Sequence, residues 1–198
     1  GQKIADSDSF VCAPIHASVS GTVKDIRKVT DPGGNTVDAV VIEAAEEDTL
    51  NSGLDKHESL DELEAGEIRN IIREAGIVGM GGAMFPTHVK VSVPDDKNVD
   101  YVILNGAECE PYLTVDHRVM VERPKSIIFG LKALMKASGA PKGIIGIDEN
   151  KPEAIESMQD AAKNDDNIEV QALETKYPQG GEKMLIEALI SREVPAGG

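Results

Sequence analysis

A glycine-rich segment is the first place in this 198-residue chain where residue types and spacing suit ligand binding. Residues 76–90 read GIVGMGGAMFPTHVK, and glycines without a Cβ let a flat or anionic ligand approach the backbone closely. The spacing matches neither the dinucleotide fingerprint nor the lysine-bearing phosphate loop. We favour ligand binding over a tight connector between helices, because the segment has more glycines than a connector needs. The candidate residues are Gly79, Gly81, Gly82, Phe85 and Lys90.

Two further polar segments follow apolar runs. NGAECEPY, residues 105–112, supplies an amide and two carboxylates that would either face a ligand or form a solvated turn. YPQGGEK, residues 177–183, places a glycine pair before a helix, where free N–H groups attract an anion or where the glycines only make a flexible connection. The candidate residues are Asn105, Glu108, Glu110, Tyr177 and Glu182.

The elements that would carry these segments alternate between helix and strand. Helix-spaced apolar residues and β-rich apolar runs predict helices at 67–76, 126–139, 151–164 and 181–191, and strands at 99–106, 143–148 and 167–173. Such alternation implies parallel strands joined by right-handed crossovers, hence an α/β fold with a mostly parallel, Rossmann-like sheet. Because ligands of such sheets bind beyond the carboxyl ends of the strands, we predict chemistry directly after Leu104, Ile147 and Leu173. Gly76 is predicted to end the first helix.

The first part of the chain has a different pattern. Residues 1–46 read as short strands broken by Pro14 and Gly21, which predicts a small all-β module. Residues 47–66 are acidic and polar and are predicted to be a linker, with Ser59 as a candidate helix cap. The α/β domain is predicted to span 67–198. Both ends look cut, so we expect a piece of a longer protein.

Composition excludes several functions. With 20 Lys+Arg against 35 Asp+Glu and 3% aromatic residues, nucleic acid is not an expected partner. The two cysteines, Cys12 and Cys109, form no metal or cluster motif, and the histidines are isolated, so no metal site is expected. No G-x-S-x-G element supports covalent hydrolase chemistry. No apolar run approaches the roughly 20 residues of a membrane-spanning helix.

In this order, the three segments resemble the flavin-binding domain of the NADH-oxidising subunit of respiratory complex I. GIVGMGGAMFPTHVK, NGAECEPYLTVDHRVM and KYPQGGEK are more similar still to the RnfC subunit of ion-translocating ferredoxin:NAD⁺ oxidoreductases. The start, GQKIADSDSFVCAPIHASVSGTV, resembles the lipoyl-like barrel-sandwich domain of that family. Each motif is weak alone, but together they cover nearly the whole chain.

The resemblance implies an electron-transfer protein with FMN as cofactor and NAD(H) as substrate. Hydride would pass between nicotinamide and flavin, while the protein supplies stacking, orientation and electrostatics. The family's motifs imply a role for each candidate residue. Gly79, Gly81 and Gly82 would line the FMN pocket, Phe85 would flank the nucleotide cleft, and Lys90 would contact the flavin side. Asn105, Glu108 and Glu110 would surround the flavin and the incoming nicotinamide, and Tyr177 and Glu182 would belong to the last flavin segment.

The resemblance also implies partners and a location. Family members carry their iron–sulfur clusters in a C-terminal ferredoxin-like domain, whose cysteine motifs do not occur in this chain, so we expect clusters only outside it and an inactive isolated piece. The implied partners are other Rnf complex subunits, NAD(H) and, indirectly, ferredoxin. The implied location is peripheral, on the cytoplasmic face of the bacterial membrane, where the whole complex couples electron transfer to ion transport.

Three positions depart from the complex I motifs. Met80 occupies a position where the complex I motif has an arginine, Ala107 one where it has an aspartate, and Gly181 one where it has a glutamate. We therefore expect the flavin reduction potential and the nucleotide affinity to differ from those of the complex I subunit. Two alternatives stay open. One is a cobalamin reductase of the propanediol-utilisation type, with the same flavin domain. The other is a structural docking subunit that has lost the cofactor.

Overall fold

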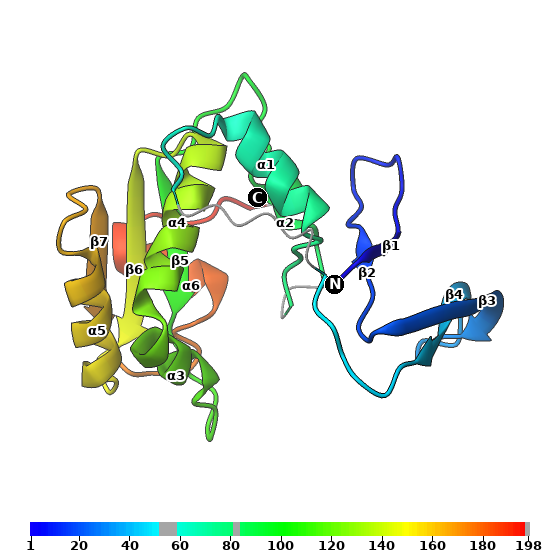
Figure 1. Cartoon of the computed structure of the whole chain (residues 1–198). Coiled ribbons are helices and arrows are strands. Elements are labelled where there is room, and N and C mark those ends of the chain that lie inside the picture. Colours follow the sequence, from blue (N-terminus) through cyan, green and yellow to red (C-terminus); the bar gives the residue numbers. More distant parts are fainter. Residues whose placement is uncertain (52–58, 81–83, 197–198) are drawn as a thin grey trace. The chain divides into compact units, whose positions relative to one another are not determined.

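The structure, a computed structural model, describes residues 1–51, 59–80 and 84–196, and its fold is α/β, which confirms the predicted class. The chain divides into two compact units (Figure 1). Unit 1 consists of Gly1–Glu62 and Arg69–Lys90, and unit 2 consists of Leu63–Ile68 and Val91–Gly198.

The described part of unit 2 is built on a parallel sheet. Its strands are β5 (Tyr101–Gly106), β6 (Lys142–Asp148) and β7 (Ile168–Leu173), in the order β5-β6-β7. Figure 1 shows β6 between the other two. Because all three run in the same direction, their carboxyl ends meet at one edge, so the prediction of a parallel sheet is confirmed.

Helices cover both faces of this sheet. Alternate residues of β6 point to opposite faces, so Ile145 and Ile147 pack with α4 (Pro124–Ser138) and α5 (Pro152–Ala162). Ile144 packs instead with α6 (Glu182–Ile190). Burial of apolar side chains on both faces explains why these strands read as continuous hydrophobic runs. The predicted helices at 126–139, 151–164 and 181–191 are confirmed, apart from small differences at their ends.

The sequence did not predict α3, Val115–Glu122. Met120 is its buried residue, whereas Val115 and Val119 are exposed, so its apolar residues do not outline one buried face. Its N-terminal residue Thr114 makes no side-chain cap, and a distant residue binds the first turn instead. Local pattern therefore carried little signal for this helix.

The β part of unit 1 consists of two antiparallel pairs. Strand β1 (Lys3–Ala5) pairs with β2 (Ile15–His16), and β3 (Gly21–Thr30) pairs with β4 (Thr36–Ala44). Of residues 1–51, Pro14 is the one that is buried. Ladder hydrogen bonds, rather than a buried core within these residues, therefore define the two pairs.

Two helices contribute to unit 1, and the residues of the first helix up to Ile68 belong to unit 2. Helix α1 runs over Ala65–Glu74 and α2 over Thr87–Lys90. Gly76 follows α1 with a φ of 66°, and a Cβ there would lie 2.6 Å from the Pro14 carbonyl oxygen, so Gly76 ends the helix as predicted. Ser59 starts no helix, because its hydroxyl accepts the Asp61 N–H in a local turn. The suggested cap at Ser59 is therefore wrong.

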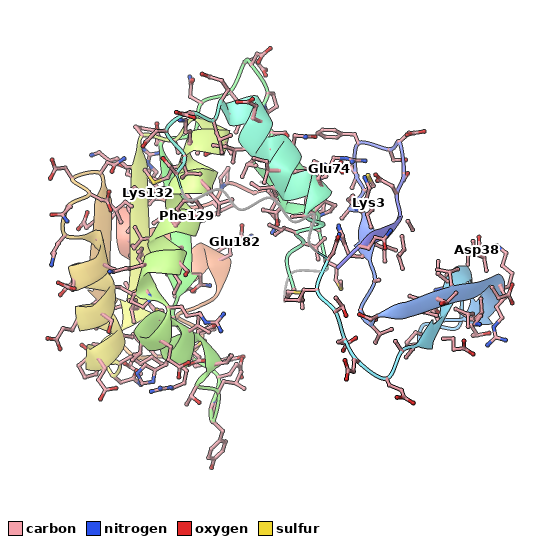
Figure 2. All side chains as sticks on the ribbon, in the orientation of Figure 1. Lys3, Asp38, Glu74, Phe129, Lys132 and Glu182 are labelled. Atoms are coloured by element: carbon pink, nitrogen blue, oxygen red, sulfur yellow. The ribbon has the colours of Figure 1, made fainter. Side chains whose placement is uncertain are left out.

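Ion pairs join α1 to the start of the chain within unit 1. Lys3 Nζ lies 2.7 Å from a Glu74 carboxylate oxygen, and Figure 2 shows the two side chains beside one another. Arg73 Nη2 donates to Asp6 at 2.9 Å. Hydrogen bonds from Lys3 and from the Ser7 N–H, with a smaller effect of Arg73, lower the pKa of Asp6 to about 2. The Asp6 carboxylate is therefore ionised throughout the physiological range.

Candidate functional site

Two loops at the carboxyl edge of the sheet bind one another directly. The Asn105 side-chain amide donates to the Gly180 carbonyl at 2.8 Å, and its oxygen accepts the Ala107 N–H at 3.2 Å. A Cβ on Gly180 would lie 2.7 Å from the Ala107 carbonyl oxygen, so only glycine fits there without a shift of the backbone. The structure thus brings together the loops after β5 and β7.

A hollow of about 440 Å³ opens beside these loops. Among the sequence-predicted residues, Glu108, Glu110 and Tyr177 line it, while Asn105 and Glu182 are outside the set of lining residues. Glu182 is exposed in the first turn of α6 (Figure 2). The other lining residues are Cys109, Pro111, Tyr112, Leu113, Thr114, His117, Asn150, Lys151, Thr175 and Lys176.

Glu108 is buried and binds the start of α3. Its Oε1 accepts the Asp116 N–H at 3.0 Å, and its Oε2 accepts the His117 N–H at 3.4 Å. A carboxylate at this point satisfies N–H groups that have no partner inside the helix and interacts favourably with the helix dipole. The Glu108 side chain therefore connects the loop after β5 to α3.

Glu110 and Tyr177 form the exposed pair of the hollow. The charge of Glu110 raises the pKa of the Tyr177 phenol, and a hydrogen bond between the two side chains adds to the effect. Both side chains are exposed to solvent. The hollow therefore offers an aromatic ring and an accepting carboxylate from two different loops.

The sequence did not identify Lys151 and Asp148 as part of this site. The Lys151 ammonium donates to the Glu108 carbonyl and to the Asn150 Oδ1, each at 3.2 Å. It lies 3.7 Å from Asp148 Oδ2, and the two residues are 8% and 1% exposed. Burial raises the pKa of Asp148, and Lys151 opposes that shift. A charged residue ending the apolar run GIIGID was the available signal.

The glycine segment lies in unit 1, where part of it is described. The Gly79 N–H donates to the Phe85 carbonyl at 3.0 Å, and the Met84 N–H donates to the Gly79 carbonyl at 3.1 Å. Phe85 and Lys90 are exposed. The remaining two candidates, Gly81 and Gly82, lie outside the described residues. These two backbone bonds join Gly79 to Met84 and Phe85.

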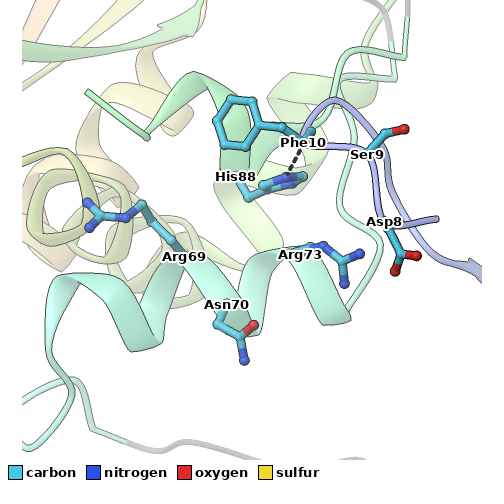
Figure 3. A pocket seen from close by; sticks show the side chains of 7 residues that line it. All are labelled: Asp8, Ser9, Phe10, Arg69, Asn70, Arg73 and His88. Atoms are coloured by element: carbon cyan, nitrogen blue, oxygen red, sulfur yellow. Dashed lines mark hydrogen bonds between the residues drawn. The ribbon is translucent and has the colours of Figure 1, made fainter. Parts of the chain in front are cut away.

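Unit 1 contains a second hollow, of about 400 Å³ (Figure 3). His88 Nε2 lies 3.1 Å from the Phe10 carbonyl oxygen, and the two rings meet edge to face. Figure 3 shows the guanidinium groups of Arg69 and Arg73 extending in opposite directions. These two cations therefore do not converge on one ligand. The lining residues are Asp8, Ser9, Phe10, Arg69, Asn70, Arg73 and His88.

Within residues 1–51, 59–80 and 84–196, no three His, Cys, Asp or Glu side chains are grouped to hold a metal ion. Over the same residues, no helix combines the length and apolar character needed to cross a membrane. Both cysteines are free thiols.

Comparisons with known proteins give a consistent result. Residues 72–198 match the family described as the Nuo51 FMN-binding domain, and residues 1–47 match the RnfC barrel sandwich hybrid domain. The chain is 48% identical, over its full length and 44% of the relative, to a subunit of the Na⁺-translocating ferredoxin:NAD⁺ oxidoreductase complex of Acetobacterium woodii. It is 51% identical, over its full length and 43% of the relative, to a subunit of the proton-translocating ferredoxin:NAD⁺ oxidoreductase complex of Clostridium ljungdahlii.

A solved structure is also similar. The NAD⁺-reducing [NiFe]-hydrogenase in its H₂-reduced state matches 63% of this chain and 24% of its own chain, with a TM-score of 0.52 and 25% identity. The chain therefore spans less than half the length of the curated relatives named above and about a quarter of the hydrogenase chain.

Proposed function

Because this chain belongs to the RnfC family and carries its Nuo51 FMN-binding domain, we propose that it serves as an electron-transfer module of an Rnf-type complex. In this proposal, electrons move between NAD(H) and iron–sulfur clusters by way of bound FMN. The complete complex, on the cytoplasmic face of the membrane, would couple that transfer to ion transport. Residues 1–46 would act as the barrel-sandwich module, 47–66 as a linker and 67–198 as the FMN domain.

The observation that carries this proposal is the contact between the loops after β5 and β7. Asn105 binds Gly180 at 2.8 Å beside the hollow that Glu110 and Tyr177 line. In parallel α/β sheets this edge is where ligands bind, and the family's flavin motifs fall on these same loops. The contact therefore supports one binding site made from segments 75 residues apart.

The residues of the hollow suit a flat, polar ligand such as the flavin ring. Tyr177 offers an aromatic face, and Glu110 offers an accepting carboxylate from the other loop. Gln179, in the same loop as Tyr177, does not line the hollow, but its buried Oε1 has no hydrogen-bond partner in the described part of the chain. An unsatisfied buried polar atom is costly, so we expect a ligand or water to bind it. The residues present thus fit the cofactor that the family implies.

The proposed roles of the chain's own residues are binding and orientation. When bound, FMN would supply the hydride and single-electron chemistry. Asn105 holds the two loops at a fixed separation, and Glu110 accepts hydrogen bonds at the edge of the hollow. The negative charge of Glu108 and Glu110 would disfavour added negative charge on a ligand and so lower its reduction potential.

The remaining proposed contacts rest on the family's motifs alone. By its motif, the glycine segment with Gly79, Gly81 and Gly82 would bind FMN, and Phe85 and Lys90 would contact the nucleotide and the flavin. Glu182 would act from the first turn of α6. The names of the relatives above do not favour the cobalamin-reductase alternative.

A spectroscopic experiment tests the proposal. The intact protein is purified, FMN is added and removed by desalting, and the visible spectrum is recorded before and after NADH. We expect retained flavin bands that NADH bleaches. A colourless protein that ignores FMN would refute the flavin assignment and favour the docking-subunit alternative.

A matched pair of variants tests the glycine segment. Gly81→Val adds a side chain where the motif places close flavin approach, and we expect loss of FMN. Gly130→Ala adds a methyl group in α4, where a Cβ would have nothing within 4 Å, and we expect unchanged FMN binding. Equal FMN occupancy in both variants would show that residues 79–82 do not hold the cofactor.

A further inference from the structure

We propose that Lys151 is a positioning residue that holds the loop after β5 in the shape that the strand-end site requires. This inference rests on the proposed function, because it concerns the same hollow. It assigns a role to a buried cation that the flavin motifs do not include. The loop in question, residues 107–110, contains both Glu108 and Glu110.

The Lys151 ammonium group points toward the loop after β5. Lys151 is the N-cap residue of α5, followed by Pro152 in the first turn. From there its Nζ reaches across to the carbonyl of Glu108, 43 residues earlier, and also donates to the Asn150 side chain. A buried lysine with two neutral acceptors and one nearby carboxylate is held in a single direction. It therefore constrains the backbone at Glu108.

Glu108 is anchored through both its backbone and its side chain. Its carbonyl accepts from Lys151, while its carboxylate accepts the first N–H groups of α3. The backbone and the side chain of one residue are thus attached to two different helices. The next carboxylate, Glu110, is two residues further along and exposed in the hollow. The anchor at Glu108 therefore sets where Glu110 points.

Lys151 also compensates a buried negative charge. Asp148 ends β6 with a carboxylate that is 1% exposed, and Lys151 is the cation beside it at 3.7 Å. Loss of Lys151 alone would leave that carboxylate uncompensated, which is strongly destabilising. Two effects must therefore be separated in a test, the compensation of Asp148 and the hydrogen bond to Glu108.

The variants are designed for that separation. Lys151→Met removes both effects, and Lys151→Met with Asp148→Asn removes the hydrogen bond without leaving a buried charge. Lys163→Met is the control, because Lys163 follows α5 directly and makes an exposed ion pair with Asp160. The double variant keeps the test decisive if the single variant does not fold.

Two readouts are used on the intact protein. The FMN dissociation constant is measured by flavin fluorescence. The pKa of Tyr177 is measured by phenolate absorbance. The chain has three tyrosines, so Tyr101→Phe and Tyr112→Phe are introduced first, which leaves Tyr177 as the remaining phenol. Because Glu110 raises the pKa of Tyr177, this pKa reports the position of Glu110 without any cofactor.

In the double variant we expect Tyr177 to titrate at lower pH and FMN to bind about tenfold or more weakly, because the loop loses its anchor. The Lys163 control should change neither. A folded double variant with an unchanged Tyr177 titration, or with an unchanged FMN dissociation constant, overturns the proposal and leaves Lys151 as a counter-charge to Asp148. If the unaltered protein binds no FMN, the proposed function fails, and the Tyr177 titration alone decides the role of Lys151.

Discussion

Replacement of Gly180 by alanine tests the contact between the two site loops most directly. The added Cβ would lie 2.7 Å from the Ala107 carbonyl oxygen and 3.5 Å from the Cys109 sulfur. The closer atom belongs to the backbone, so no side-chain rotation relieves the overlap. The loops after β5 and β7 must move apart, and the hydrogen bond from Asn105 to the Gly180 carbonyl is strained by the same movement.

The size of the effect follows from these distances. Ordinary van der Waals contact begins near 3.4 Å, so the loops must separate by roughly 0.7 Å. Overpacking of this kind costs about 1–3 kcal/mol, and loss of the Asn105 hydrogen bond would add about 1 kcal/mol. Alanine also restricts the unfolded chain, which offsets about 0.4–1 kcal/mol. We therefore expect Gly180→Ala to lower the free energy of unfolding by about 1–3 kcal/mol.

Urea unfolding and FMN titration measure the two consequences. Gly130→Ala is the control, because its Cβ meets no atom within 4 Å and alanine is the better helix former, which predicts about 0.5–1 kcal/mol of stabilisation. For Gly180→Ala we also expect FMN affinity to fall about tenfold, because the loops that line the hollow have moved.

Comparison of the two variants shows whether the close contact between the loops exists in solution. If Gly180→Ala raised the unfolding midpoint as Gly130→Ala does, and left FMN affinity unchanged, the close contact of the loops would not exist in solution. Lower stability with unchanged FMN affinity would instead show that the contact is structural and that the cofactor binds elsewhere.

Three further predictions concern single side chains. Glu110→Gln should lower the pKa of Tyr177, seen in a phenolate absorbance titration, and an unchanged titration would show that the two groups do not meet. Met158→Ala should lower the free energy of unfolding by about 2–5 kcal/mol in urea, because Met158 is fully buried in α5; a loss below about 1 kcal/mol would contradict this packing. Asp148→Asn should gain stability relative to the unaltered protein as the pH rises from about 4 to 7, because burial, opposed by Lys151, raises the pKa of Asp148 above its unfolded value of about 3.9 and makes the charged form unfavourable in the fold. That gain should disappear as the pH falls below about 4, where both states are protonated, and a gain independent of pH would refute the assignment.

Much of unit 2 was predictable because its signals are local. Apolar runs such as the one that ends at Asp148 predicted buried strands, and helix-spaced apolar residues predicted α4, α5 and α6. The helix missed was α3, whose exposed Val115 and Val119 give no clear apolar face and whose cap is Glu108, seven residues before its first residue. When the group that stabilises a helix is distant in sequence, the periodicity of apolar residues does not predict that helix well.

The candidate site was predictable in its segments but not in its contacts. The motifs selected Asn105, Glu110 and Tyr177 as residues of one site, and their loops do meet at the carboxyl edge of the sheet. The motifs did not select Lys151, because a lysine before a proline at a helix start is common on protein surfaces. Its burial depends on how α5 packs beside the loop after β5.

The sequence by itself determined the fold class of this chain, its resemblance to the RnfC family and the segments that carry polar residues at strand ends. Those features depend on the spacing of apolar residues and on the order of the motifs, and both can be observed directly in the sequence. Only the tertiary structure decided that the Asn105 amide binds Gly180 and that Lys151 binds the Glu108 carbonyl, partners 75 and 43 residues apart. The direction of such bonds follows from how strands and helices pack, because a shift of a few tenths of an ångström makes or breaks a hydrogen bond.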